Sequence, residues 1–385
     1  MPSALARRIS STEPAVETCA IWSLAPASLA RDISLATMTS SAAAGGFTTI
    51  CCMPNTNPVN DSRSVTEFII GQAKKAGFCK VLPIGAITKG SMGTELAEMG
   101  EMAEAGCTGF SDDGKPVANA EMMRHALEYA KTFGRTIISH CEEPALSAGG
   151  VMNEGAVSAR LGLRGIPSAA EEVMVARDIS LARLTGARLH VAHVSTAGSV
   201  ELIRRAKAEG ISVTAETCPH YFTLTDEGVV SYNTYLKVNP PLRTEADRKA
   251  IIGGLEDGTI DVIATDHAPH AASEKDVEFD LAPFGISGLE TALALAMALA
   301  HSGLIPMAEL LRKFTVNPAL ALGMAPPSLL PGSPADIVLI DPETEKTVRP
   351  EILLSKGKNT AFSGLVLKGW PVMTIHEGKK IEFKH

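Results

Sequence analysis

The chain has 385 residues, of which 45% are hydrophobic and 20% are charged, and this is enough for one large globular domain and a smaller one. A net charge of -8 without a basic run argues against a nucleic-acid partner and against an anionic membrane surface. No apolar run approaches the roughly 18 residues that a membrane span needs, so we expect a soluble protein that acts on a small molecule.

The first 44 residues differ in composition from the rest of the chain. They contain no glycine and no lysine, whereas all 33 glycines come later. A targeting peptide is one interpretation, although Glu13, Glu17 and Asp32 argue against it because such peptides are poor in acidic residues. A poorly ordered tail is a second interpretation, and a third depends on the family resemblance described below.

From Gly45 onward, short β-branched runs alternate with amphipathic helices that end at glycine, which is typical of βα units around a parallel sheet. Ser168 and Glu171 predict a capping box at the start of a helix that ends at Gly186. The other expected helices cover residues 62–76, 119–133, 199–209 and 305–323.

Seven strands are expected between these helices. An open doubly wound sheet would place its binding loops at one switch point. Here nearly every strand has polar residues at its carboxyl end, which favours an α/β fold of the (β/α)8 barrel type. The strands are expected at residues 47–53, 80–88, 107–111, 135–139, 187–193, 211–217 and 260–266.

The pattern changes after the helix near 305–323. The run ADIVLID at 335–341 and the hairpin turn at Glu377-Gly378 predict a small β domain, of which only the C-terminal half is expected. We therefore divide the chain into an aberrant N-terminal segment (1–41), a hydrolase barrel (42–328) and a small β domain (329–385).

Polar residues that follow the apolar runs would all meet at one mouth of a barrel. Any one of them could be a hydrogen-bonded, partly buried residue, but a mixed set of histidines and carboxylates suits zinc or a similar divalent ion. The set consists of Asp112, Asp113, His140, His193, Asp266, His267 and His270. As metal ligands we expect Asp113, His140, His193 and Asp266.

The motif ATDHAPH at 264–270 is the most specific of these signals. Asp266 could accept the proton of an attacking water and return it to a leaving nitrogen, or it could simply cap the next helix. His190 points the same way as His193 because they lie two residues apart on a strand, so it is a possible alternative ligand.

The remaining histidines and the cysteines carry weaker signals. We expect His125, His220, His301, His376 and His385 to be ordinary surface or core residues. Seven cysteines without a C-x-x-C pair indicate reduced thiols and a cytoplasmic location, and Cys51-Cys52 most simply packs inside the barrel.

Several motifs together resemble dihydroorotase of the long bacterial type. The resemblance covers residues 42–385 and rests on GGFTTICCMPNTNPVND at 45–61, FSDDGKPV at 110–117, SHCEE at 139–143, GVMNEG at 150–155, HVAHVST at 190–196, VNPPLR at 238–243, ATDHAPH at 264–270 and GSPADIVLID at 332–341. It implies an amidohydrolase-superfamily barrel, a cyclic amide hydrolase that reversibly converts dihydroorotate to N-carbamoyl-L-aspartate in pyrimidine synthesis.

The resemblance also implies roles for individual residues. Two zinc ions per chain are expected for the family, with Asp113, His140, His193 and Asp266 as ligands and Asp266 also as general acid and base. The residues that it implies for substrate binding are Asn55, Asn239, His270 and the main chain at Phe284-Gly285. Dihydropyrimidinase and allantoinase differ at the bridging position, where a carboxylated lysine replaces Asp113; Lys115 lies close by but does not match that position.

One motif of the family is missing. The first barrel strand should end in H-x-H-x-R, but no histidine precedes His125. Three explanations are open. Residues 1–41 could be a frame-shifted or misassigned start, or the chain could be an impaired homologue that serves as a scaffold for aspartate transcarbamoylase. In the third, residues 1–41 are authentic but divergent, and four ligands hold the metal. As written, the first strand is missing or replaced, and the chain should hold at most one zinc, weakly. We also expect a homo-oligomer.

Overall fold

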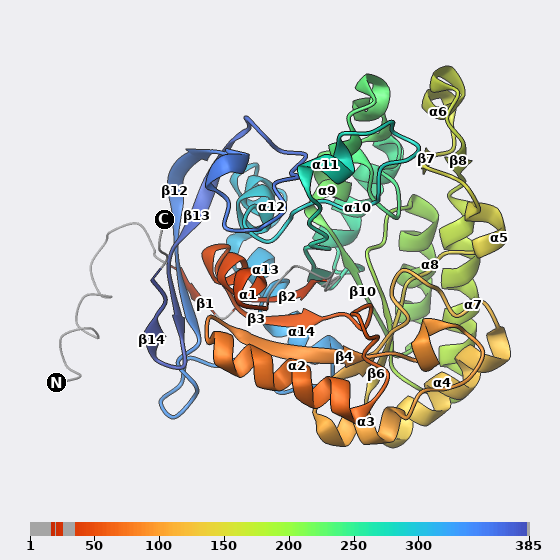
Figure 1. Ribbon diagram of the computed structural model, residues 1–385, viewed down its shortest axis with the longest axis horizontal. Coiled ribbons are helices and arrows are strands. Elements are labelled where there is room, and N and C mark those ends of the chain that lie inside the picture. The colour runs from red at the N-terminus through yellow and green to blue at the C-terminus, as the bar shows by residue number, and fades with distance from the viewer. Residues whose placement is uncertain (1–16, 20, 26–34, 383–385) are drawn as a thin grey trace.

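The computed structural model describes residues 17–19, 21–25 and 35–382, and its centre is a sheet of eight parallel strands (Figure 1). The strands of this sheet are paired in chain order from β2 to β11. The short strands β7 and β8 do not belong to it and pair with each other. The sheet contains β2 (Ile21–Ala25), β3 (Phe47–Cys52), β4 (Lys80–Gly85), β5 (Gly109–Phe110), β6 (Thr136–Ser139), β9 (Leu189–Val191), β10 (Val213–Thr217) and β11 (Val262–Ile263).

All seven expected strands are present, although most are shorter than the apolar runs that predicted them. Every residue of β3 and of β6 is buried. Helices cover the outer side of the sheet, so its strands are buried on both faces and read as continuous apolar runs (Figure 1). The expected barrel fold is therefore confirmed.

The eighth strand, β2, occupies the place beside β3 where we expected a missing or replaced strand. It pairs in parallel with β3, from Ile21 opposite Phe47 to Ala25 opposite Cys52, and it lies against α14 (Val316–Ala321). A strand from the N-terminal segment thus covers this edge of β3. The first strand is replaced in sequence and is not missing from the sheet.

The barrel helices follow the expected pattern, and the helix ends at Gly77 and Gly186 adopt the left-handed conformation that glycine favours. The larger helices are α1 (Leu35–Ala44), α2 (Arg63–Ala76), α3 (Met99–Ala105), α4 (Ala120–Thr132), α7 (Ala169–Thr185), α8 (Ala197–Ala208), α10 (Glu245–Glu256) and α12 (Ala292–His301). Shorter elements are α5 (Pro144–Ser147), β7 (Met152–Asn153), α6 (Ala156–Leu161), β8 (Gly165–Ile166), α9 (Pro219–Thr223), α11 (Ala272–Lys275) and α13 (Met307–Arg312).

Two helix predictions need correction. The side chain of Ser168 makes no capping hydrogen bond at the start of α7, so the predicted capping box is wrong. Glu171 instead accepts hydrogen bonds from the backbone of Ser195 and Thr196. The single helix expected at 305–323 is two helices, α13 and α14. Pro318 has no backbone N–H to donate to the carbonyl of residue 314, so one helix cannot run through this point, whereas a proline is tolerated in the first turn of α14.

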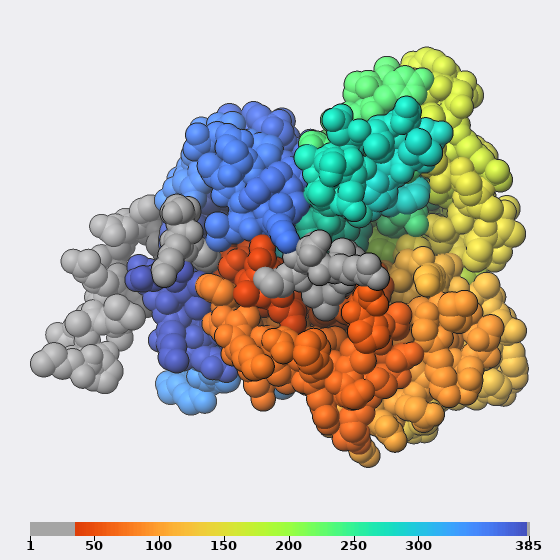
Figure 2. Space-filling model, in the orientation of Figure 1, coloured from red at the N-terminus to blue at the C-terminus, as the bar shows by residue number. Residues whose placement is uncertain are grey.

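The small β domain is a four-stranded antiparallel sheet in the order β1-β12-β13-β14. Its strands are β1 (Glu17–Cys19), β12 (Ile337–Thr347), β13 (Val366–His376) and β14 (Lys379–Lys380), and the predicted turn at Glu377-Gly378 has a positive φ at both residues. β1 supplies a strand from the N-terminal segment, most of which lies outside the described residues together with His385. Figure 2 shows this sheet, in blue, against the start of the barrel, in red.

A partly buried carboxylate joins the barrel to the small domain. Glu290, just before α12, accepts hydrogen bonds from the hydroxyl of Ser41 and from the backbone of Leu354 and Ser355, each at 2.8 Å. Burial raises the pKa of Glu290, and these donors oppose that rise. Within the described part of the chain, no helix is long and apolar enough to cross a membrane.

We predict that Glu290→Ala lowers the free energy of unfolding by about 2–3 kcal/mol, because it leaves two backbone N–H groups without an acceptor. Urea denaturation followed by circular dichroism would measure this change. Glu95→Ala is the matched control, since Glu95 forms only an exposed ion pair with Lys89 and its loss should change stability by less than about 1 kcal/mol. Equal effects of the two substitutions would contradict the role of Glu290.

Candidate active site

A cavity of about 290 Å³ opens at the carboxyl ends of the barrel strands. All nine residues expected to bind a metal or a substrate line it, and they come from the segments that follow six strands, β3, β5, β6, β9, β10 and β11. The lining residues are Asn55, Asp113, Gly114, His140, His193, Asn239, Asp266, Ala268, His270, Phe284 and Gly285.

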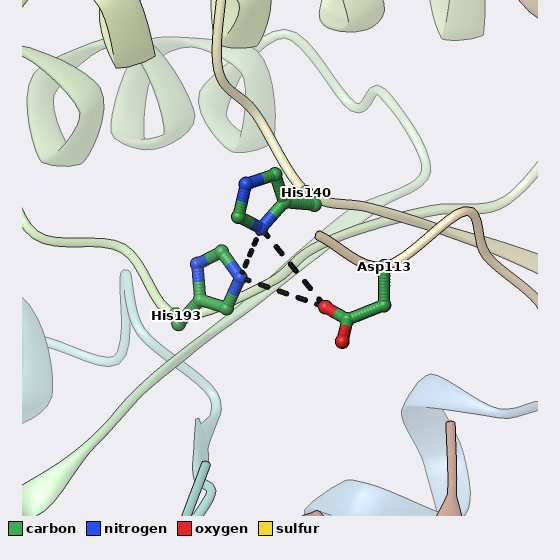
Figure 3. A group of neighbouring side chains, drawn as sticks. All are labelled: Asp113, His140 and His193. Atoms are coloured by element: carbon green, nitrogen blue, oxygen red, sulfur yellow. Dashed lines mark hydrogen bonds and ion pairs between the residues drawn. The ribbon is translucent and has the colours of Figure 1, made fainter. Parts of the chain in front are cut away.

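Three of the expected metal ligands converge on one point (Figure 3). His140 Nδ1 and His193 Nε2 lie 2.8 Å apart, and Asp113 Oδ1 lies 4.0 Å from each of these nitrogens. All three side chains are buried. Asp113 follows β5, His140 follows β6 and His193 follows β9, and these strands are neighbours in the sheet.

This group fits a divalent cation. Two imidazole nitrogens that face each other across a short distance can share only one hydrogen, whereas a cation between them could use both lone pairs. Two histidines and a carboxylate are a donor set that zinc prefers when it keeps a position open for water. The structure therefore offers at least one site where a metal could be held by Asp113, His140 and His193.

The protonation states around this group favour a cation. Burial, followed by the neighbouring His140, holds the pKa of His193 well below its usual value, so His193 stays neutral. Burial also opposes a charge on His140, but Glu142, Asp113 and Asp266 outweigh it and raise the pKa of His140. A deprotonated His140 would leave an excess of carboxylates in a buried cavity, and such an excess attracts cations.

Asp266 belongs to a second group of potential ligands. It lines the same cavity, and it forms a group with Cys218 and His220 in which the ligand atoms of the three residues lie within 4.8 Å of one another. Burial, and next the charge of Asp113, raises the pKa of Asp266 to about 8. We had expected His220 to be an ordinary surface or core residue and had given Cys218 no role, although both follow strand 211–217 as the other candidates follow theirs.

Two of the cavity residues have an unusual backbone conformation. His193 and Asp266 have φ values of 35° and 45°, in the left-handed region that non-glycine residues rarely adopt. Glu171 supports the turn after His193, since it accepts hydrogen bonds from the backbone of Ser195 and Thr196. Strain of this kind persists where the surrounding structure fixes it, and it is common at functional sites.

The expected substrate contacts offer polar groups to the cavity. Asn55 Nδ2 donates a hydrogen bond to Asp113, while Asn55 Oδ1 and Asn239 Oδ1 are buried without a hydrogen-bond partner among the described residues. His270 Nε2 lies 2.8 Å from the carbonyl oxygen of Phe284. Unpaired buried amide oxygens are costly unless a ligand or water pairs with them.

The small domain also supports the cavity. Asn359 accepts a hydrogen bond from the backbone of His270 and donates one to the carbonyl of Gly285. It thereby fixes the separation between the two loops that form this wall. Asn359 could not be predicted from sequence, because it lies in an irregular segment between the strands of the small domain.

Two residues of the expected set, and the alternative ligand His190, do not line the cavity. Asp112 accepts hydrogen bonds from the backbone of Ile87 and Thr88. His267 accepts hydrogen bonds from the backbone of Gly288 and Leu289, so our expectation that Asp112 and His267 face the cavity is wrong. His190 is buried inside the barrel, 3.2 Å from Glu216, and does not line the cavity.

Comparisons with known proteins agree on one family. Residues 23–199 match the family model described as Dihydro-orotase-like. A protein named Dihydroorotase from Pelotomaculum thermopropionicum is 58% identical over 346 residues, which cover 90% of this chain and 81% of that protein. Another protein of this name, from Syntrophus aciditrophicus, is 56% identical over 88% of this chain and 79% of its own length.

Solved structures confirm the fold. L-Hydantoinase (dihydropyrimidinase) from Arthrobacter aurescens has a TM-score of 0.85 at 25% identity, with 96% of this chain and 86% of that chain covered. Dihydropyrimidinase from Brevibacillus agri has a TM-score of 0.80 at 21% identity and covers 97% of this chain and 87% of its own, which shows a shared fold alone.

We predict that His193→Ala weakens zinc binding by at least about a hundredfold, because it removes one of three converging donors. Isothermal titration with the protein stripped of metal would measure the affinity. His125→Ala is the control, since His125 lies on the exposed side of α4 and should leave the affinity unchanged. Unaltered binding by His193→Ala would exclude this residue as a ligand.

We also predict that zinc binding weakens as the pH falls through the raised pKa of His140. A protonated imidazole has no lone pair for the metal, so the proton competes with the cation, and the loss should begin above the ordinary histidine range. Titrations between about pH 8 and about pH 5 would reveal this dependence. An affinity that stays constant over this range would argue against histidine ligands.

Proposed function

Because the chain belongs to the dihydroorotase family, we propose that it reversibly hydrolyses the ring amide of (S)-dihydroorotate to N-carbamoyl-L-aspartate, a step of pyrimidine synthesis. The observation that carries this proposal is the meeting of all nine expected site residues in one cavity. The two relatives named Dihydroorotase, at 58% and 56% identity over most of the chain, support it independently.

The described residues divide the chemistry between them. Asp113, His140 and His193 would hold a zinc ion, whose chemistry is to acidify water and to polarise a carbonyl group. Asp266 lines the same cavity and would take a proton from the attacking water as the new C–O bond forms. It would then deliver that proton to the ring nitrogen as the C–N bond breaks.

The environment of Asp266 suits this double role. With its pKa raised to about 8, the carboxyl group can both hold and release a proton near neutral pH. The second carboxyl of the cavity, Asp113, is the largest charged contributor to this rise after burial itself. A positive charge in the cavity would lower the pKa of Asp266 and so prepare the ionised form that accepts the proton.

Neutral donors and acceptors would orient the substrate. Asn55 and Asn239 present amide groups, and His270 is held by the Phe284 carbonyl and faces the same space. Among the described residues that line the cavity there is no lysine or arginine, although the substrate carries a carboxylate. In the absence of an arginine side chain for this carboxylate, main-chain groups at Phe284-Gly285 would carry a larger share of substrate binding.

The wider setting follows from the same family. We propose zinc as the metal, a homo-oligomer as the assembly and a cytoplasmic location; the six described cysteines are all free and buried, which agrees with a reducing compartment. A scaffold for aspartate transcarbamoylase is the alternative, and it is motivated by the missing H-x-H-x-R motif. The names of the relatives favour the enzyme over the scaffold.

We predict that the zinc-loaded chain hydrolyses dihydroorotate and that Asp266→Asn lowers kcat by about 10³-fold, because the amide cannot accept a proton. A spectrophotometric assay of dihydroorotate, with the metal content measured in the same sample, would test this. Asp257→Asn is the control, since Asp257 is exposed at the end of α10 and should keep full activity.

The same preparations would separate the two functions. A chain that binds zinc, shows no hydrolysis and co-purifies with aspartate transcarbamoylase would support the scaffold and exclude the enzyme. A chain that hydrolyses dihydroorotate without the transcarbamoylase would support the enzyme.

A further inference from the structure

Cys218, His220 and Asp266 bring a thiol, an imidazole and a carboxylate together at the carboxyl ends of β10 and β11. Their ligand atoms lie within 4.8 Å of one another. We propose that these three residues form a second cation site, separate from Asp113, His140 and His193, which binds a thiophilic divalent cation such as zinc.

The topology brings these residues together. β10 and β11 are parallel neighbours, with Glu216 opposite Val262 and Thr217 opposite Ile263, so the residues that follow them emerge side by side. Cys218 directly follows β10, and His220 lies on α9, which begins at Pro219. The first barrel strand contributes nothing to this group, so the missing histidine pair does not affect it.

An unpaired atom points to a ligand at this site. His220 is only 2% exposed, and its Nε2 has no hydrogen-bond partner among the described residues. Its ring packs edge-on against the ring of Tyr221 at 4.2 Å, and the hydroxyl of Tyr221 donates a hydrogen bond to the carbonyl of Pro240. The imidazole is thus held in place with a ring nitrogen that nothing in the described structure satisfies, which is costly unless a ligand binds it.

The donor atoms select the kind of cation. A thiolate and an imidazole suit zinc and related soft or borderline ions, whereas magnesium and calcium prefer oxygen alone. Three protein ligands would leave a fourth position open. Asp266 lines the cavity while Cys218 and His220 do not, so the cation would lie in the cavity wall with its open position toward the substrate space.

Two cation sites would therefore share one cavity, one on the ends of β5, β6 and β9 and one on the ends of β10 and β11. The proposal differs in this from the expectation from sequence, which was at most one zinc, held weakly. The inference concerns cation binding alone and does not depend on the hydrolysis of dihydroorotate, so either can fail while the other stands.

Cobalt(II) offers a direct test with the full chain, because a thiolate bound to cobalt gives a near-ultraviolet charge-transfer band that nitrogen and oxygen ligands do not give. We expect the wild type to bind about two cobalt ions per chain and to show this band. Cys218→Ser should lose the band and about one equivalent of metal, and it should keep the visible absorption from the other site.

Cys141→Ser is the matched control. Cys141 is also buried and directly follows His140, but its thiol is directed toward Ser139 and Asp178. This variant should keep the charge-transfer band. A second variant, His220→Gln, should weaken the step that produces the band by at least about tenfold.

Several results would overturn the proposal. They are a wild type that takes up cobalt without the band, a band that survives Cys218→Ser, and a band that disappears in Cys141→Ser. Circular dichroism and thermal melting of each variant would establish that it is folded, and a wild type without the band overturns the proposal even if a variant does not fold. Loss of dihydroorotate hydrolysis with an intact band would count against the proposed function and not against this site.

Discussion

Neighbouring parallel strands must end at the same edge of a sheet, and every functional feature of this chain depends on that constraint. β5, β6, β9, β10 and β11 are consecutive in the sheet although the residues after them span positions 111 to 266. Side chains that are far apart in sequence therefore meet in one cavity of about 290 Å³. The small domain supports the same cavity, because Asn359 is hydrogen-bonded to the loops at His270 and Gly285.

Burial gives this arrangement its chemical character. Asp113, Asp266 and Glu216 are carboxylates held in or beneath the cavity, and burial is the largest cause that raises the pKa of each. Concentrated carboxylates in a poorly solvated space can be stabilised by protons or by cations. The backbone of His193 and of Asp266 adopts a conformation that is unfavourable for these residue types, so the surrounding structure must supply the energy that fixes them. A bound cation would offset the negative charge of the buried carboxylates, and its ligands are already held in position by the surrounding structure.

The barrel and the cavity residues could be predicted from sequence because both follow from periodic signals. Apolar runs marked the seven later strands, and the polar residue at the end of each run marked the cavity. The same rule erred for Asp112 and His267, since a residue at a strand end can also turn toward backbone N–H groups, and the sequence does not show which way it turns. It overlooked Cys218 and His220 because their neighbours on other strands are needed to recognise them.

Glu171 looked like half of a capping box because it has the correct spacing from Ser168, but it accepts hydrogen bonds from residues 195–196 instead. β2 could not be predicted, since its role is defined by pairing with β3 and its residues carry none of the expected motif.

Strands β1 and β2 are separated by a single residue, yet β1 pairs with β12 of the small sheet and β2 pairs with β3 of the barrel. A link of one residue limits how far apart these two strands can lie, so the edges of the two sheets must be close together. Proteolytic removal of residues up to 26 would take away one edge strand from each sheet, β1 and β2. Each sheet would then expose a new edge that could pair with another molecule.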